Sequence, residues 1–127
     1  MSETLTDGVR IIVKPAFWPE RSSPDSGQWA FTYAVTVVNE GTRVATLRAR
    51  HWVITDATGR VEEVRGEGVV GKQPRLEPGE RFEYTSWAML RTQFGSMRGE
   101  YVMERADGSR FEAKITEFAL TQPNALN

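Results

Sequence analysis

The sequence predicts an all-β domain, a sandwich of about seven antiparallel strands in two sheets. Apolar residues recur with a period of two along most of the chain, which is the pattern of half-buried strands. Glycine with Asn, Asp or Pro interrupts these runs at short intervals, as the turns of a sandwich require. The best helical segment, residues 87–97, contains Gly95 and has no clear cap. A length of 127 residues suits a single domain, with a core from about residue 9 to 120 and frayed ends.

The runs with strand character are, in chain order, residues 9–17, 29–38, 44–55, 60–64, 81–87, 99–105 and 110–120. The run at 29–38 alternates most strongly, and its large residues share the face that we expect to be buried: Trp29, Phe31, Tyr33, Val35 and Val37. In the run at 44–55, alternation places Leu47, Ala49, His51 and Val53 opposite Arg48, Arg50, Trp52 and Ile54. We expect Trp52 to pack in the core.

The connections divide into short turns and longer segments. Short turns are predicted at residues 39–42, 56–59, 77–80 and 106–109, where Gly accompanies Asn, Asp or Pro. The connections at 15–27, 66–79 and 87–99 are longer than a hairpin needs. Since consecutive antiparallel strands alternate in direction, alternate connections should lie at opposite ends. We therefore expect 15–27, 56–59 and 87–99 at one pole, and 39–42, 66–79 and 106–109 at the other.

Composition narrows the class of protein. The absence of cysteine excludes disulfides and thiolate metal sites, and it fits a reducing compartment. A formal net charge of −1 argues against a nucleic-acid binder, which is usually basic. The sequence has no apolar run of the ~20 residues that a membrane span needs, and acids stand where a signal peptide would be basic. We expect a cytoplasmic protein that does not enter the membrane.

Residues 66–74, "GEGVVGKQP", contain the spacing G-x-G-x-x-G of a dinucleotide-binding loop at Gly66, Gly68 and Gly71. Such a loop holds pyrophosphate at the start of a helix, but two prolines soon after Gly71 prevent an uninterrupted helix here. We therefore expect a structural loop with positive φ at its glycines, anchored by Val69 or Val70. The alternative is a backbone site for phosphate or a nucleotide, assisted by the nearby basic residues Arg65, Lys72 and Arg75. No cofactor is predicted.

Three segments, "RHWVITDATG", "VRGEGVVGKQPRLEPGERFEYTS" and "GSMRGEYVM", resemble the ApaG domain family, and the resemblance extends from about Val9 to Leu120. It implies an immunoglobulin-like or fibronectin type III-like β-sandwich and a genetic link to cobalt resistance and magnesium efflux. Similar domains in F-box proteins and in a polymerase-delta-interacting protein suggest contact with other proteins. The resemblance brings no catalytic residues with it.

The sequence contains few side chains that could act in catalysis or bind a metal ion. His51 is the only histidine, and we expect it to have a structural role beside Trp52. A single His without Cys argues against a tight cobalt site. Glu62 and Glu63 point to opposite faces of a strand and cannot chelate one ion together, so we interpret these acids, with Asp56 and Glu67, as a solvated hairpin edge. We assign no catalytic and no metal-binding residue.

Aromatic residues in connections are the remaining candidates. We expect Trp18 and Trp87 in the long connections, where, with Arg91 and Phe94, they could anchor a protein partner. The alternative is that each tryptophan caps one end of the core.

The sequence thus predicts a non-catalytic binding module rather than an enzyme. Its expected ligand is an unidentified protein, and self-association is left open. The alternative function is a phosphate- or nucleotide-binding regulator that uses the loop from Gly66 to Gly71.

Overall fold

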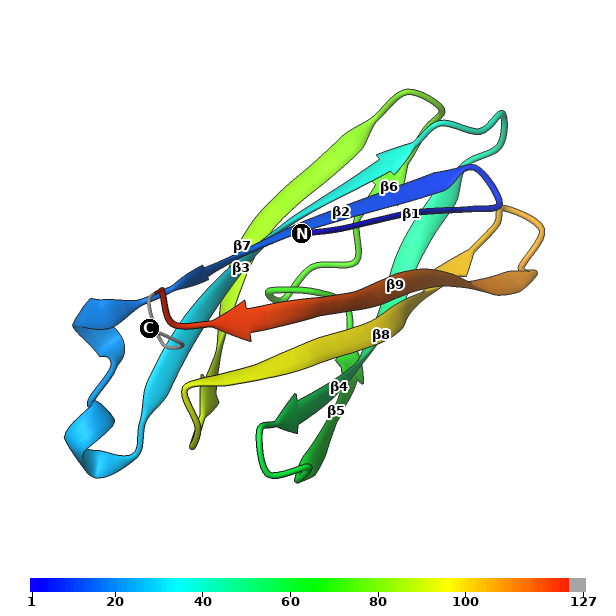
Figure 1. The fold of residues 1–127 in the computed structure, drawn as a ribbon. Coiled ribbons are helices and arrows are strands. Elements are labelled where there is room, and N and C mark those ends of the chain that lie inside the picture. The colour runs from blue at the N-terminus through cyan, green and yellow to red at the C-terminus, as the bar shows by residue number, and fades with distance from the viewer. Residues whose placement is uncertain (124–127) are drawn as a thin grey trace.

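The computed structural model describes residues 1–123, which form nine strands and two short 3-10 turns (Figure 1). The strands are β1 (Ser2–Thr6), β2 (Val9–Phe17), β3 (Trp29–Asn39), β4 (Ala45–Asp56), β5 (Val61–Glu67), β6 (Arg75–Leu76), β7 (Arg81–Leu90), β8 (Phe94–Glu104) and β9 (Arg110–Thr121). The turns η1 (Pro19–Arg21) and η2 (Pro24–Ser26) lie between β2 and β3. Within these residues no helix is long and apolar enough to cross a membrane.

The strands of residues 1–123 pair antiparallel into a four-stranded sheet, β1-β2-β3-β7, and a five-stranded sheet, β5-β4-β8-β9 with β6 also on β4. The predicted class, an all-β sandwich of two sheets, is confirmed, and each of the seven expected runs is a strand. Two strands were not expected. The strand β1 begins at Ser2, well before the predicted core boundary, and β6 is a two-residue strand within a predicted connection. Of the C-terminal tail, residues 124–127 lie outside the described residues.

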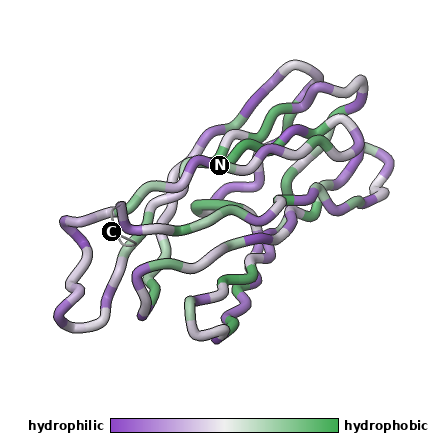
Figure 2. The backbone as a smooth tube through the Cα atoms, viewed as in Figure 1, coloured by the Kyte–Doolittle hydropathy of each residue, from purple (hydrophilic) through white to green (hydrophobic). Residues whose placement is uncertain are grey.

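Alternation along the strands produces the core (Figure 2). Phe31, Tyr33 and Val35 of β3 are buried as predicted, whereas Trp29 is half-buried and donates a hydrogen bond from Nε1 to Gln122 Oε1 at 3.0 Å. Trp52 is 2% exposed and meets three aromatic rings edge-on, those of Tyr33, Tyr101 and Phe118, at centroid distances of 5.2–6.1 Å. Such pairs add roughly 0.5–1.5 kcal/mol each beyond burial.

A β-bulge in β4 alters the predicted alternation. The register of β4 with β8 shifts between Leu47 and Ala49, so the residues on either side of Arg48 no longer follow one period. Leu47 is therefore buried in the same core as Trp52, although simple alternation predicts opposite faces for these two residues.

The two lateral sides of the sandwich differ. On one side β9 lies against β1 and β2 (Figure 1), and Ser2 Oγ is 2.7 Å from Thr116 Oγ1 across the two sheets. On the other side the sheets end with β5 and β7, and in the described part of the chain each of these strands pairs with a neighbour on one side alone. We call these the closed side and the open side.

The predicted arrangement of the poles is confirmed. At one pole Ala57 N donates to Thr92 Oγ1 at 3.0 Å, and Trp18 packs on Trp87. At the other pole Gly79 N donates to Asn39 O at 2.7 Å, and Arg43 pairs with Asp107 at 3.2 Å.

The predicted long connection at 87–99 is wrong, because β7 and β8 extend through it and leave a turn at residues 91–93.

Candidate functional site

An aromatic corner, defined by Trp18, Arg21, Trp87 and Met89, lies where the η1 segment meets the outer face of β7. The rings of Trp18 and Trp87 stand edge to face with centroids 5.8 Å apart. The guanidinium carbon of Arg21 lies 5.4 Å from the centroid of Trp87, a cation–π contact. Trp87 remains 44% exposed and Met89 36% exposed, so the corner presents apolar surface to solvent.

Two parts of the sequence interpretation change here. Trp87 belongs to the edge strand β7 rather than to a loop, whereas Trp18 does lie in the connection after β2. The structure brings the two tryptophans into contact. Arg91 lies in the turn that follows β7, and Phe94, which is 42% exposed, begins β8. Sequence reasoning missed Arg21 and Met89, although the period of two from Trp87 to Met89 was visible.

The glycine loop interrupts one edge row of the larger sheet. Both β5 and β6 pair with the same strand, β4, at Ala49–Thr55 and at Ala45–Thr46 respectively. Between them the chain leaves the sheet in a tight turn, in which Val69 N donates to Lys72 O at 2.8 Å and Lys72 N donates to Val69 O at 2.9 Å. Within residues 1–123 no helix follows Gly71, so the pyrophosphate geometry of a dinucleotide fold is not built.

Each loop glycine has its own structural reason. Gly68 and Gly71 have φ of 63° and 79°, and a Cβ on Gly68 would stand 2.3 Å from Lys72 O. Gly66 does not have the positive φ expected of it, because it lies within β5, and a Cβ there would stand 2.8 Å from the guanidinium of Arg50. Val69 is 1% exposed and anchors the loop as predicted, whereas Val70 is 55% exposed with φ of 45°.

The basic residues assigned to this loop do not converge. Arg65 and Arg75 lie opposite His51 and Thr46 of β4, about 17 Å apart at the usual rise per residue of a strand. Each has a glutamate close by: Arg65 lies 3.6 Å from Glu63, and Arg75 Nη1 lies 2.6 Å from Glu77 Oε1. Lys72 is exposed at the turn. The arrangement supplies separate surface charges rather than one anion site.

A different arginine, Arg50, makes contacts with the glycines of the loop. Its Nη1 donates to the carbonyl oxygens of Glu67 at 3.1 Å and of Gly68 at 2.9 Å. The guanidinium lies against Gly66, where a side chain would displace it. Sequence reasoning missed this role, because it depends on the pairing of β4 with β5.

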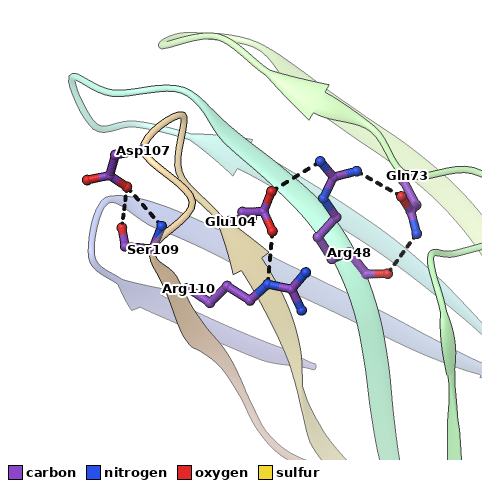
Figure 3. Close-up of polar contacts among 6 residues, drawn as sticks. All are labelled: Arg48, Gln73, Glu104, Asp107, Ser109 and Arg110. Atoms are coloured by element: carbon purple, nitrogen blue, oxygen red, sulfur yellow. Dashed lines mark hydrogen bonds and ion pairs between the residues drawn. The ribbon is translucent and has the colours of Figure 1, made fainter.

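Beside the loop, a polar cluster joins several strands (Figure 3). Arg48 donates to Gln73 Oε1 at 2.9 Å and to Glu104 Oε1 at 3.2 Å, and Arg110 Nε donates to Glu104 Oε2 at 2.9 Å. These two arginines hold the pKa of Glu104 below its usual range, Arg110 contributing most. The cluster fastens the glycine loop to β4, β8 and β9.

His51 lies between two carboxylates. Its Nδ1 is 2.8 Å from Glu100 Oε1 and its Nε2 is 2.8 Å from Glu63 Oε1. Hydrogen bonds to Glu100, and secondly to Glu63, raise the pKa of His51, and the same contact lowers the pKa of Glu63. The structural role predicted for His51 thus takes the form of an ionic bridge across β5, β4 and β8 rather than packing beside Trp52.

Two of the four carboxylates considered for a metal, Asp56 and Glu63, have other partners. Asp56 accepts hydrogen bonds from Thr58 and from the backbone N–H of Arg60, which shape the β4–β5 turn. Glu63 is committed to His51. Within residues 1–123 no group of three His, Asp or Glu side chains is arranged to hold an ion.

Together these features define a small antiparallel β-sandwich domain with an exposed aromatic corner and an open lateral side. The sequence profile of the ApaG domain matches residues 19–105, and the chain belongs to the ApaG domain family. A protein ApaG from Anaeromyxobacter dehalogenans strain 2CP-C is 54% identical over 127 residues, the whole length of both chains. A protein ApaG from Ralstonia nicotianae is 54% identical over 117 residues, 92% of this chain and 94% of its own.

Solved structures agree with this assignment. The crystal structure of an ApaA protein from Bordetella pertussis superposes with a TM-score of 0.90 at 45% identity, and covers 96% of this chain and 99% of its own. A second X-ray structure, from a structural genomics consortium, has a TM-score of 0.88 at 41% identity, and covers 94% of this chain and 91% of its own.

Proposed function

We propose that this ApaG-family domain is a non-catalytic module that binds another protein through its aromatic corner. The observation that carries the proposal is the exposure of Trp87 on an edge strand, where it is held by Trp18 and Arg21. Protein interfaces are enriched in Trp, Met and Arg, and their energy concentrates on a few such residues. Since the neighbouring ring and guanidinium already order Trp87, little side-chain entropy remains to be lost on binding.

The chemistry of the described residues supports a binding role over catalysis. Both ring nitrogens of His51 are hydrogen-bonded to carboxylates, so the imidazole has no nitrogen free to serve as a base for a nucleophile. Tyr84 and Tyr101 form a hydrogen-bonded pair in which burial raises the pKa of both hydroxyls, so these phenols stay protonated.

The link of the family to cobalt resistance and magnesium efflux is, in this proposal, indirect. The module would act through its protein partner in the cytoplasm, the compartment that a cysteine-free composition favours. No ion needs to bind the domain itself.

A site-specific crosslink tests the proposal. A photoreactive amino acid would be placed at Met89, beside Trp87, and for comparison at Lys114 on β9. We expect a protein crosslinked in the native host from position 89 and not from position 114. Binding of that purified protein should then weaken by roughly 30-fold or more in Trp87→Ala, the loss typical of an interface hot spot.

Thr85 provides the matched control, because it is exposed on the same strand two residues from Trp87. Thr85→Ala should leave the affinity within about two-fold, as most interface-neighbouring residues do. Equal crosslinking from both positions, or full affinity in a folded Trp87→Ala variant, would contradict the proposal.

A further inference from the structure

A cleft opens between the two sheets on the open side of the sandwich, where β5 and β7 end them. Its volume is about 370 Å³, within the range of small-molecule sites. Side chains of both sheets line it, among them Trp52, Ile54, Val64 and Met97 of the five-stranded sheet and Tyr33 and Ala88 of the four-stranded sheet. Trp52 and Met97 belong to the buried core and are 2% and 0% exposed, so the apolar surface that this sheet offers to the cleft comes from Ile54 and Val64, which are half-buried and pack against that core.

Arg50 brings a positive charge to the cleft beside these apolar side chains. On β4 it follows the same alternation as Trp52, two residues away, and it lines the cleft with it. Its contacts are the carbonyl oxygens of Glu67 and Gly68, which orient the guanidinium without neutralising it. Among residues 1–123 no carboxylate lies within 4.0 Å of Arg50, in contrast to Arg48, which is 3.2 Å from Glu104.

The polar groups near Arg50 do not supply the missing negative charge. Tyr33 lines the cleft, and burial raises the pKa of its hydroxyl, so Tyr33 is neutral at physiological pH. Ser86, directly opposite Tyr33 in the β3–β7 register, is also neutral. Glu62 lines the cleft as an exposed residue but makes no ion pair with Arg50. A half-buried guanidinium without a counter-ion favours an anion, because charges interact more strongly away from bulk water.

We propose that this cleft binds a small apolar or aromatic molecule that carries one carboxylate. The carboxylate pairs with Arg50, whose planar guanidinium suits two parallel hydrogen bonds, and the apolar group lies against Ile54 and Val64. Gly66 is the positioning residue. A Cβ at this position would stand 2.8 Å from the guanidinium of Arg50, so a glycine is needed for the guanidinium to lie beside the β5 backbone. The loop from Gly66 to Gly68 thus holds the protein's own arginine toward a ligand instead of holding a phosphate.

An NMR titration of the full chain tests the cleft with two matched probes, 2-naphthoate and its neutral analogue 2-naphthamide. We expect saturable shifts at Trp52, Ile54 and Val64 with the acid, and an affinity for the amide at least about ten-fold weaker. Equal affinities for the two probes, or shifts that concentrate elsewhere, would overturn the proposal.

Charge variants of opposite sign sharpen the test. Arg50→Gln should weaken naphthoate binding by about ten-fold or more, since the pairing charge is lost. Glu62→Gln should strengthen it by roughly two- to five-fold, because a negative charge leaves the same cleft. The control is Arg98→Gln on β8, an exposed residue outside the cleft lining, which should change the affinity by less than about two-fold.

If Arg50→Gln does not fold, the affinity of Glu62→Gln for 2-naphthoate is enough to test the proposed site. Glu62 is exposed on an edge strand, so its substitution should leave the fold intact. An unchanged or weaker affinity in Glu62→Gln would refute the site. This outcome is distinct from failure of the proposed protein partner, because the titration contains no partner protein.

Discussion

Replacing Gly68 with Ala should destabilise the domain far more than replacing Gly71 with Ala, although the two glycines have similar backbones. Their φ angles are 63° and 79°. Their surroundings differ. A Cβ on Gly68 would lie 2.3 Å from Lys72 O and 3.0 Å from Lys72 C, whereas a Cβ on Gly71 has nothing within 4 Å among the described residues. The pair therefore separates the effect of a left-handed backbone from the effect of close backbone approach.

The magnitudes follow from these two effects. An Ala in the left-handed region costs about 1–2 kcal/mol, and the loss of flexibility in the unfolded chain returns roughly 0.4–1 kcal/mol. Gly71→Ala should therefore lower the free energy of unfolding by about 1 kcal/mol. At Gly68 the clash adds about 1–3 kcal/mol of overpacking, because Lys72 O is backbone and also accepts the hydrogen bond from Val69 N. Gly68→Ala should thus cost about 2–4 kcal/mol in all.

Urea unfolding followed by tryptophan fluorescence measures both free energies, and the dependence on urea should be the same in both variants. Lys72→Ala is the control for altering the exposed side chain of the same turn, and it should stay within about 0.5 kcal/mol of the parent. The reasoning is refuted if Gly68→Ala and Gly71→Ala differ by less than about 0.5 kcal/mol, which is the limit of ordinary surface effects.

Two further predictions concern other strained or charged positions. Val70→Asn should raise the free energy of unfolding by about 1 kcal/mol, since a β-branched residue at φ of 45° is strained and Asn tolerates this region; an unchanged urea midpoint would contradict it. For His51, hydrogen bonds to Glu100 and Glu63 raise the pKa in the folded protein, so its stabilisation should be complete below the unfolded value of about 6.5 and lost as pH rises through the folded pKa. Urea midpoints measured across that rise should fall in the parent chain and fall less in His51→Gln; identical profiles would argue against the bridge.

The strands with strong alternation could be predicted from the sequence, whereas features set by strand pairing could not. The large residues of β3 face the core because a period of two leaves no other choice. The bulge beside Arg48 cannot be recognised in the alternation of the sequence, so simple alternation assigned Leu47 to the wrong face. The strand β1, "SETLT", has one large apolar residue, and it exists because β2 and β9 provide partners for it.

The candidate site divides in the same way. The sequence indicated Trp18 and Trp87, since isolated tryptophans stand out, but not their contact, which depends on the register of β7 with β3. It also indicated a structural use for the glycines, because the prolines after Gly71 exclude a helix. The partner of Gly66 is Arg50, sixteen residues earlier, and this pairing follows from the antiparallel register of β4 and β5 rather than from local sequence.

The closed side of the sandwich has a consequence for the order in which the protein can form during translation. The strand that meets β1 and β2 there is β9, which ends at Thr121, so the first strands to leave the ribosome must wait for the last one. Between the end of β3 and the end of β9 the ribosome adds roughly 80 residues, which takes about 4–16 s at usual rates of synthesis. During that interval β4, β5 and β8 of the opposite sheet are made, but the side where β9 covers β1 and β2 stays open. The nascent chain should therefore be a good substrate for ribosome-associated chaperones until β9 has emerged.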